Sequence, residues 1–148
     1  MPTTDLQTSV RAFFDSYRAA FERQDAAAIA DHFAYPAHVT SDTGEIVLVP
    51  ITNRPEWISK VEQLLGMYRA IGVGSAHVLD LMLTEISPRL LQAKINWALQ
   101  TAAGEPLYDF EAIYTLAHTA GAFHIAAIAH NELPQYQACY TRLKARTD

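Results

Sequence analysis

The chain has 148 residues, half of them apolar and 18% charged, and its net charge is −5. This length predicts one domain spanning residues 1–148, and the composition excludes a disordered chain, which needs low hydrophobicity and high net charge. The acidic balance excludes the basic surface of a nucleic-acid-binding protein. No apolar run approaches the ~20 residues of a membrane span, and the N-terminus lacks the pattern of a signal peptide. We therefore expect a cytoplasmic protein with neither nucleic-acid nor membrane partners.

Apolar residues at helical spacing predict three helices in the first half of the chain. The first covers residues 5–23, the second covers 26–33 after the capping residue Asp25, and the third begins near Asn53 and ends at residues 72–74. Between the second and third helices, turn residues 41–44 predict a hairpin of 37–40 with 45–49.

Alternating apolar and polar residues predict four long strands in the second half, over residues 76–86, 89–101, 107–118 and 122–131. From Pro134 onward we expect a tail that is helical in part. Closing the hairpin around residues 103–104 places Trp97 opposite Phe110 and Ala93 opposite Tyr114. Closing the next one around 120–121 places Tyr114 near Ala127 and Leu116 near Ile125, so that the large apolar residues share one sheet face.

The opposite face of the predicted sheet is half polar. It collects Lys94, Asn96, Glu111, Thr115, His124 and His130, interleaved with Ile113, Ala126 and Ile128. Such a face suits either solvent or a contact between two copies of the chain. We predict a homodimer through it, and the low charged fraction agrees with two covered sheet faces.

Two segments carry a resemblance to a known superfamily. Residues 10–42 (VRAFFDSYRAAFERQDAAAIADHFAYPAHVTSD) and 89–132 (RLLQAKINWALQTAAGEPLYDFEAIYTLAHTAGAFHIAAIAHNE) resemble the nuclear-transport-factor-2-like (NTF2-like) proteins, in particular SnoaL-like polyketide cyclases and ketosteroid isomerase. The resemblance implies an α+β cone-shaped fold, with three N-terminal helices packed on a curved antiparallel sheet. It also implies an apolar pocket inside the cone and a dimer through the other sheet face.

The resemblance suggests Tyr17 as a group that stabilises negative charge in the pocket, as a tyrosine in a similar segment does in ketosteroid isomerases. That mechanism also needs a base and a neutral carboxylic acid. Alignment of the segments places Ser41 at the position of the base, with Asp42 one place later, and Ile113 at the position of the acid. Steroid isomerase activity is therefore not expected, whereas another proton transfer remains open.

Histidines are the other candidates for proton transfer near neutral pH. Of the six in the chain, His38 on the first strand is the best placed for a pocket mouth, and His130 at the end of the last strand is second. His124 and His130 lie six residues apart on one strand, about 20 Å, which is too far for a shared metal ion. We therefore expect neither a metal site nor a cofactor.

The remaining candidates also have structural interpretations. Asp109 and Glu111 share one strand face, where a surface ion pair with Lys94 is favoured over acid–base chemistry. Phe14, Trp57, Leu65, Trp97, Phe110 and Tyr114 are the expected lining of an apolar ligand pocket, although a core needs the same residues. Cys139 has no expected catalytic partner.

Two hypotheses follow. The first is an enzyme that isomerises, cyclises or dehydrates a small hydrophobic molecule, with Tyr17 stabilising negative charge and His38 or Asp42 taking the proton. The second is a non-catalytic ligand-binding or dimeric assembly module of the same fold. The departures from the isomerase pattern at Ser41 and Ile113 favour the second slightly.

Overall fold

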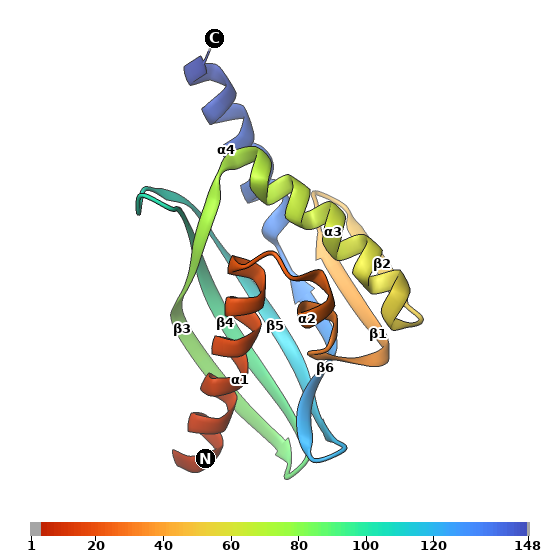
Figure 1. Cartoon of the computed structure of the whole chain (residues 1–148). Coiled ribbons are helices and arrows are strands. Elements are labelled where there is room, and N and C mark those ends of the chain that lie inside the picture. The colour runs from red at the N-terminus through yellow and green to blue at the C-terminus, as the bar shows by residue number, and fades with distance from the viewer. Residues whose placement is uncertain (1–3, 148) are drawn as a thin grey trace.

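A curved six-stranded sheet forms the centre of the computed structural model, which describes residues 4–147 (Figure 1). Its strands run in the order β2-β1-β6-β5-β4-β3. They are β1 (Phe33–Asp42), β2 (Ile46–Ile51), β3 (Val73–Ser87), β4 (Leu90–Thr101), β5 (Pro106–Thr119) and β6 (Ala122–His130). Neighbouring strands are antiparallel except β1 and β6, which are parallel. The expected purely antiparallel sheet is therefore corrected to a mixed one.

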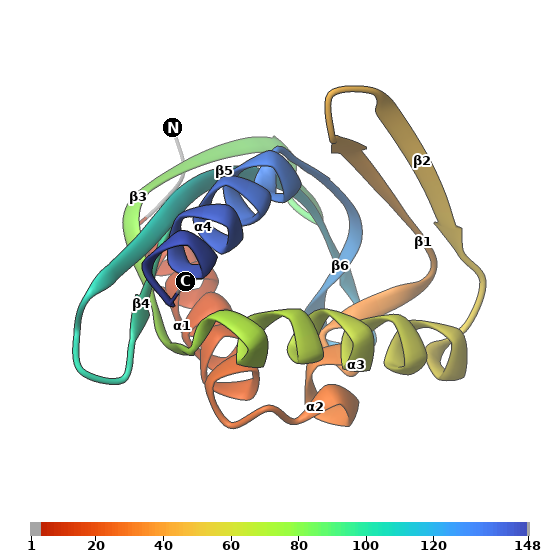
Figure 2. The same ribbon diagram turned by 90° about the horizontal axis from the view of Figure 1, so that it is seen from above.

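Four helices accompany the sheet, in an α+β arrangement. They are α1 (Thr4–Glu22), α2 (Ala26–Ala30), α3 (Arg54–Ile71) and α4 (Glu132–Thr147). Figure 2 shows the strands curving around one side, with α1, α2 and α3 on the concave side and α4 across one end of the curve. The expectation of three N-terminal helices is not matched exactly, because the sheet is accompanied by four helices and the expected partly helical tail is the helix α4. None of the described helices has the length and hydropathy that crossing a membrane requires.

Local sequence signals set the ends of the third helix. The Asn53 side chain accepts a hydrogen bond from the Glu56 N–H at 3.0 Å, which satisfies an amide that has no partner within the helix. Gly72 follows the last helical residue with φ of 77°, the left-handed conformation that glycine adopts without steric cost. The second helix is shorter than predicted because the chain enters β1 at Phe33.

The register of the β4–β5 hairpin is the predicted one. Trp97 lies opposite Phe110, and Ala93 lies opposite Tyr114. The following hairpin differs by one residue, because Leu116 pairs with Ile125 as expected while Tyr114 pairs with Ile128 rather than Ala127. The register shift lies between Thr115 and Leu116, and it makes a β-bulge in β6.

This bulge reverses the faces of the C-terminal part of β6. Ile128 is only 8% exposed and belongs to the main core. The expected placement of Ile128 and His130 on the outer face is therefore wrong, because an extra residue in a strand exchanges inward and outward positions beyond it. Val39, Ile128 and Tyr114 now form one inner row across three strands.

Two apolar clusters hold the elements together. The main one lies between the inner sheet face and helices α1 to α3, with Phe14, Ile95 and Leu116 among its fully buried members. A smaller one joins α4 to the end of α3 and the start of β5, through Ile71, Leu107, Tyr136 and Cys139. Its position fixes the first turn of α4 beside the main cluster.

Candidate functional site

An apolar cavity of about 110 Å³ lies between α1, α3 and the inner face of the sheet. Its walls are mainly aromatic and aliphatic side chains from α1, α3, β1 and β3 to β6, and its polar members come from α1, the start of β3, the end of β6 and the start of α4. The lining residues central to its chemistry are Tyr17, Trp57, Tyr68, Trp97, Tyr114, His130 and Glu132. Helices from the first half of the chain and the last strand thus meet around one space.

The carboxyl group of Glu132 is the most deeply buried charged side chain in the described chain. Glu132 is the first residue of α4, and its Oε2 accepts a hydrogen bond from the Tyr68 hydroxyl at 2.5 Å and one from the Tyr108 hydroxyl at 2.8 Å. Residues 4–147 provide no hydrogen bond to Oε1. That oxygen is therefore the one available to a molecule in the cavity.

Burial sets the protonation of this group. Desolvation raises the pKa of Glu132 to about 7, even though the two tyrosine hydroxyls stabilise its anion and lower the pKa. Burial and then the charge on Glu132 in turn hold the pKa of Tyr68 and of Tyr108 well above the usual value. Near neutral pH the carboxyl is present in both forms, whereas both tyrosines stay protonated.

His130 lies beside this carboxyl, at the end of β6. Its Nδ1 accepts the Glu132 backbone N–H at 3.2 Å, so the ring proton is on Nε2, which donates to the Ser41 hydroxyl at 3.0 Å. Burial lowers the pKa of His130. The neutral imidazole therefore joins β6 to β1 and holds the backbone at the start of α4.

Tyr17 and Tyr114 also line the cavity and contribute two more hydroxyl groups. The Trp97 indole N–H donates to the Tyr114 hydroxyl oxygen at 2.9 Å, and no acceptor for either tyrosine proton lies among the described residues. Burial raises the pKa of both phenols. At Tyr114, the hydrogen bond from Trp97 lowers the pKa and so offsets part of this rise, whereas the charge of Glu132 raises it further. At Tyr17, the charges of Tyr114 and Glu132 raise the pKa further. Both hydroxyls are thus protonated donors near the carboxyl.

Trp57 contributes a donor of a different kind. Its indole nitrogen is buried and has no hydrogen-bond partner within the described chain. Its ring packs against Phe33 with centroids 5.1 Å apart. A buried N–H without a partner is energetically unfavourable, so an acceptor that reached it would gain a full hydrogen bond.

The polar edge of the cavity is formed at the end of α1. Arg18 donates to Glu22 Oε1 at 2.8 Å, and Glu22 Oε2 accepts the Ala76 backbone N–H at 3.0 Å, which joins α1 to β3. Gln24 extends this edge toward α3, where Arg69 donates to its Oε1 at 2.9 Å. Charged and amide side chains therefore form one edge of the cavity, whereas the rest of its wall is mainly apolar.

Two of the predicted catalytic residues lie elsewhere. His38 alternates with the inner residue Val39 on β1 and therefore faces outward, where its Nδ1 is 3.4 Å from the Thr40 hydroxyl. Asp42 is exposed at the hairpin turn and accepts the Gly44 N–H at 3.1 Å. Neither lines the cavity with Tyr17, because strand alternation and the turn direct both side chains away from it.

The expected pocket residues are largely brought together. Trp57, Leu65, Trp97, Phe110 and Tyr114 all line the cavity. Phe14 does not, because it lies in the layer behind, with its ring centroid 4.8 Å from that of Tyr114.

Glu132 was not predicted from the sequence, and His130, the second histidine candidate, lies in the cavity wall rather than on the expected outer face. An isolated acidic residue directly after a predicted strand and just before Pro134 was the available signal. The expected ion pair between Lys94 and Glu111 is present on the outer face, with Nζ and Oε2 3.6 Å apart. Within residues 4–147, no three His, Cys, Asp or Glu side chains gather closely enough to hold a metal ion.

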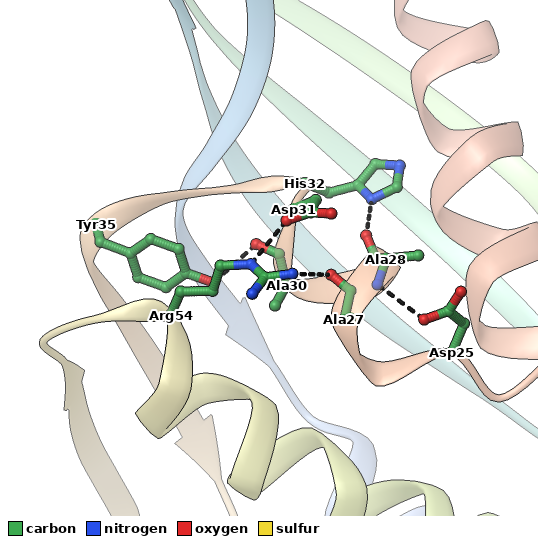
Figure 3. A network of polar contacts seen from close by, with 8 residues as sticks. All are labelled: Asp25, Ala27, Ala28, Ala30, Asp31, His32, Tyr35 and Arg54. Carbon is green, nitrogen blue, oxygen red and sulfur yellow. Dashed lines mark hydrogen bonds and ion pairs between the residues drawn. The ribbon is translucent and has the colours of Figure 1, made fainter.

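A second polar network joins the helices outside the cavity (Figure 3). Arg54 donates to Asp31 Oδ1 at 2.7 Å and to the Ala27 carbonyl at 3.3 Å, which fixes α3 against α2. The His32 Nδ1–H donates to the Ala28 carbonyl at 2.7 Å, and its Nε2 accepts the Ser16 hydroxyl at 2.9 Å, which fixes α1. This network holds the helical wall in place.

Comparisons with known proteins agree with this arrangement. The family model described as NTF2-like protein (DUF6841) matches residues 7–133. The chain belongs to the NTF2-like family DUF6841. In sequence, this NTF2-like chain matches no curated protein.

Solved structures of low sequence identity share the NTF2-like fold. Aln2 from a Streptomyces species is 14% identical with a TM-score of 0.72, covering 100% of this chain and 99% of its own. An NTF2-like protein of unknown function from Pseudomonas putida is 11% identical with a TM-score of 0.68, covering 87% of each chain. A cystatin-like domain of unknown function from Nostoc punctiforme is 15% identical with a TM-score of 0.65, covering 88% of this chain and 78% of its own. At these identities the likeness concerns the fold alone.

Proposed function

We propose that the cavity binds a small apolar molecule bearing one carbonyl oxygen and that Glu132 transfers a proton to or from it. The observation that carries this proposal is a buried carboxyl with a pKa raised to about 7 in an apolar wall. General acid–base catalysis is most effective when the pKa of the group lies near the working pH. Perturbed carboxyl groups in clefts are also typical of functional sites.

The size of the cavity limits the molecule. A volume of about 110 Å³ is similar to that of an engineered apolar cavity of ~150 Å³ that binds benzene. The proposed substrate is therefore a single ring or a short branched chain. A fused ring system would have to extend out through the mouth.

The proposed chemistry is proton abstraction next to the carbonyl. The ionised Glu132 takes a proton from the carbon through Oε1, the electron pair of the C–H bond forms a carbon–carbon double bond, and the π pair of the carbonyl group moves to its oxygen. Tyr17 and Tyr114 donate hydrogen bonds to the resulting enolate, with Trp97 holding the Tyr114 hydroxyl so that its proton is free. In a β,γ-unsaturated substrate, return of the proton from the Glu132 carboxyl to the γ-carbon is isomerisation. In a β-hydroxy substrate, transfer of that proton to the hydroxyl group, which leaves as water while the carbonyl re-forms, is dehydration.

Cyclohexanone in D2O tests the proposal, because any such site exchanges α-protons for deuterium, which NMR follows. We expect exchange at neutral pH at least ~100-fold faster with the wild-type chain than with Glu132→Gln. Glu111→Gln makes the same change on the outer face and leaves the rate unaltered. Equal rates for wild type and Glu132→Gln would exclude Glu132 as the base.

A second candidate function is assembly, favoured by a strip on the outer sheet face in which four of the six residues are apolar. Leu48, Thr40, Ala129, Ile113, Lys94 and Met82 lie in register across all six strands. Leu48 is 63% exposed and Met82 61%. A second copy of the chain covers such a strip by placing the same strip against it, as in a two-fold symmetric dimer.

Sizing chromatography tests the assembly proposal. We expect the wild-type chain to elute as a dimer and Ile113→Glu as a folded monomer, because a charge at the centre of the strip opposes burial. Gln63→Glu adds the same charge on the exposed side of α3 and keeps the dimer. A wild-type chain that is monomeric at all concentrations leaves the strip as a solvated surface.

A further inference from the structure

A polar groove adjoins the apolar cavity at its mouth. Gln24 and Leu65 line both spaces, and therefore form the boundary between them. Beyond this boundary the groove is lined by four charged side chains, Arg23, Asp25, Glu62 and Arg69. An apolar molecule in the cavity that carries a polar tail would extend past Gln24 into this groove.

Arg69 differs from the other cations around the two spaces. Arg18 is paired with Glu22 at 2.8 Å, and Arg23 is paired with Asp25 at 3.6 Å. Among the described residues, Arg69 has no carboxylate within 4.0 Å. Its guanidinium instead donates to the neutral side chain of Gln24, at the boundary itself. One positive charge at the mouth is thus left without a counter-charge.

Gln24 holds this position in an unusual backbone conformation. Its φ is 57°, in the left-handed region that follows many helix ends and is usually occupied by glycine. Glycine would satisfy the backbone but would remove the polar part of the boundary and leave Leu65 alone there. The glutamine side chain is a neutral acceptor on the guanidinium that a stronger acceptor can displace.

We propose that Arg69 forms an anion subsite, so that the apolar carbonyl compound in the cavity also carries one carboxylate, which replaces Gln24 on Arg69. The planar guanidinium fork matches a carboxylate in two parallel hydrogen bonds. The exposed carboxylate of Glu62 in the same groove opposes a second negative charge, which selects a singly charged group. This inference rests on the proposed binding role of the cavity.

Matched pairs of probes test the subsite. Calorimetry would measure the affinity of phenylacetate, 3-phenylpropanoate and 4-phenylbutanoate, each beside its primary amide, which has nearly the same shape and no charge. We expect one tail length to bind about tenfold more tightly as the acid than as the amide. Arg69→Gln should remove this difference and leave the amide affinity within about twofold of wild type.

Two further variants separate a local contact from a general effect of charge. Arg11→Gln removes the same charge from an exposed position on α1 and should keep the acid preference, whereas Glu62→Gln should increase it. Amides that bind as well as acids, or an acid preference that survives Arg69→Gln, overturn the subsite and leave the cavity proposal standing. Absence of binding by every acid and amide overturns both.

Discussion

The same kinds of side chain are buried on the inner side of the sheet and exposed on its outer face. On the inner face the carboxyl of Glu132 is buried and bonded only to neutral hydroxyls, whereas Glu111 on the outer face is half exposed and paired with Lys94. Ile128 is 8% exposed on the inner face, and Ile113 is 39% exposed on the outer one. Residue type alone therefore does not separate a site from a surface in this fold.

A single extra residue in β6 accounts for much of this difference. The bulge opposite Thr115 and Leu116 turns Ile128 and His130 inward, and His130 then meets the start of α4. Without the bulge, Ile128 would lie on the outer face and would no longer line the cavity. The composition of the cavity thus depends on one local irregularity in the strand.

The two isoleucines give the largest expected contrast. Ile128→Ala should lower the free energy of unfolding by about 2–4 kcal/mol, because it removes buried methyl groups and leaves a space. Ile113→Ala should lower it by less than about 1 kcal/mol, because the side chain is already partly in water. Denaturant unfolding measures both, and equal losses would mean that the inner and outer assignments of β6 and β5 are incorrect.

The buried carboxyl should make stability depend on pH. The pKa of Glu132 is raised from 4.5 to about 7, so the folded state keeps a proton that the unfolded state has released. The free energy of unfolding should therefore fall as the pH rises from 4.5 to about 7, by about 3 kcal/mol, and be level above. The Glu132→Gln variant has no carboxyl group to titrate at this position, so its free energy of unfolding should not show this fall.

The difference between wild type and Glu132→Gln, followed by thermal unfolding across this pH range, isolates the carboxyl. The lowered pKa of His130 has the opposite effect, because it makes the free energy of unfolding rise with pH. His130 is present in both wild type and Glu132→Gln, so its contribution cancels in the difference between them. Glu111→Gln is the outer-face control. A difference that does not change with pH would contradict a raised pKa at Glu132.

The hydrogen-bonded pair Trp97 and Tyr114 on the inner face should have a larger coupling energy than the ion pair Lys94 and Glu111 on the outer face. Trp97→Phe, Tyr114→Phe and the double variant form a cycle with an expected coupling of about 1 kcal/mol, because the 2.9 Å bond is buried. Unfolding in denaturant provides the four values. Coupling indistinguishable from zero would show that Trp97 does not hold the Tyr114 hydroxyl.

The smallest expected effect belongs to the outer ion pair. Lys94→Gln, Glu111→Gln and the double variant should show a coupling of about 0.5 kcal/mol or less, since both side chains are half exposed. Added salt should weaken it further. A coupling larger than that of Trp97 and Tyr114 would reverse the contrast between the faces.

Sequence periodicity was sufficient for the long helices α1 and α3 and for the β4–β5 hairpin, because these depend on local caps, turns and alternation. Trp97 and Phe110 face each other because a short turn fixes the register. The β6 bulge and the parallel pairing of β1 with β6 depend on contacts between distant segments, which alternation does not encode. The burial of Glu132 was missed for the same reason, because its partner Tyr68 is 64 positions away in the chain.

One oxygen atom, Oε2 of Glu132, receives hydroxyl groups from α3 and β5 while it belongs to the first turn of α4. A ribosome delivers the walls of the cavity before it delivers this residue. The other residues that line the cavity precede Glu132 in the chain, so Tyr68 and Tyr108 gain their shared acceptor only when the first turn of α4 packs against α3 and β5. The contacts that pack the C-terminal helix therefore also place the carboxyl in the cavity.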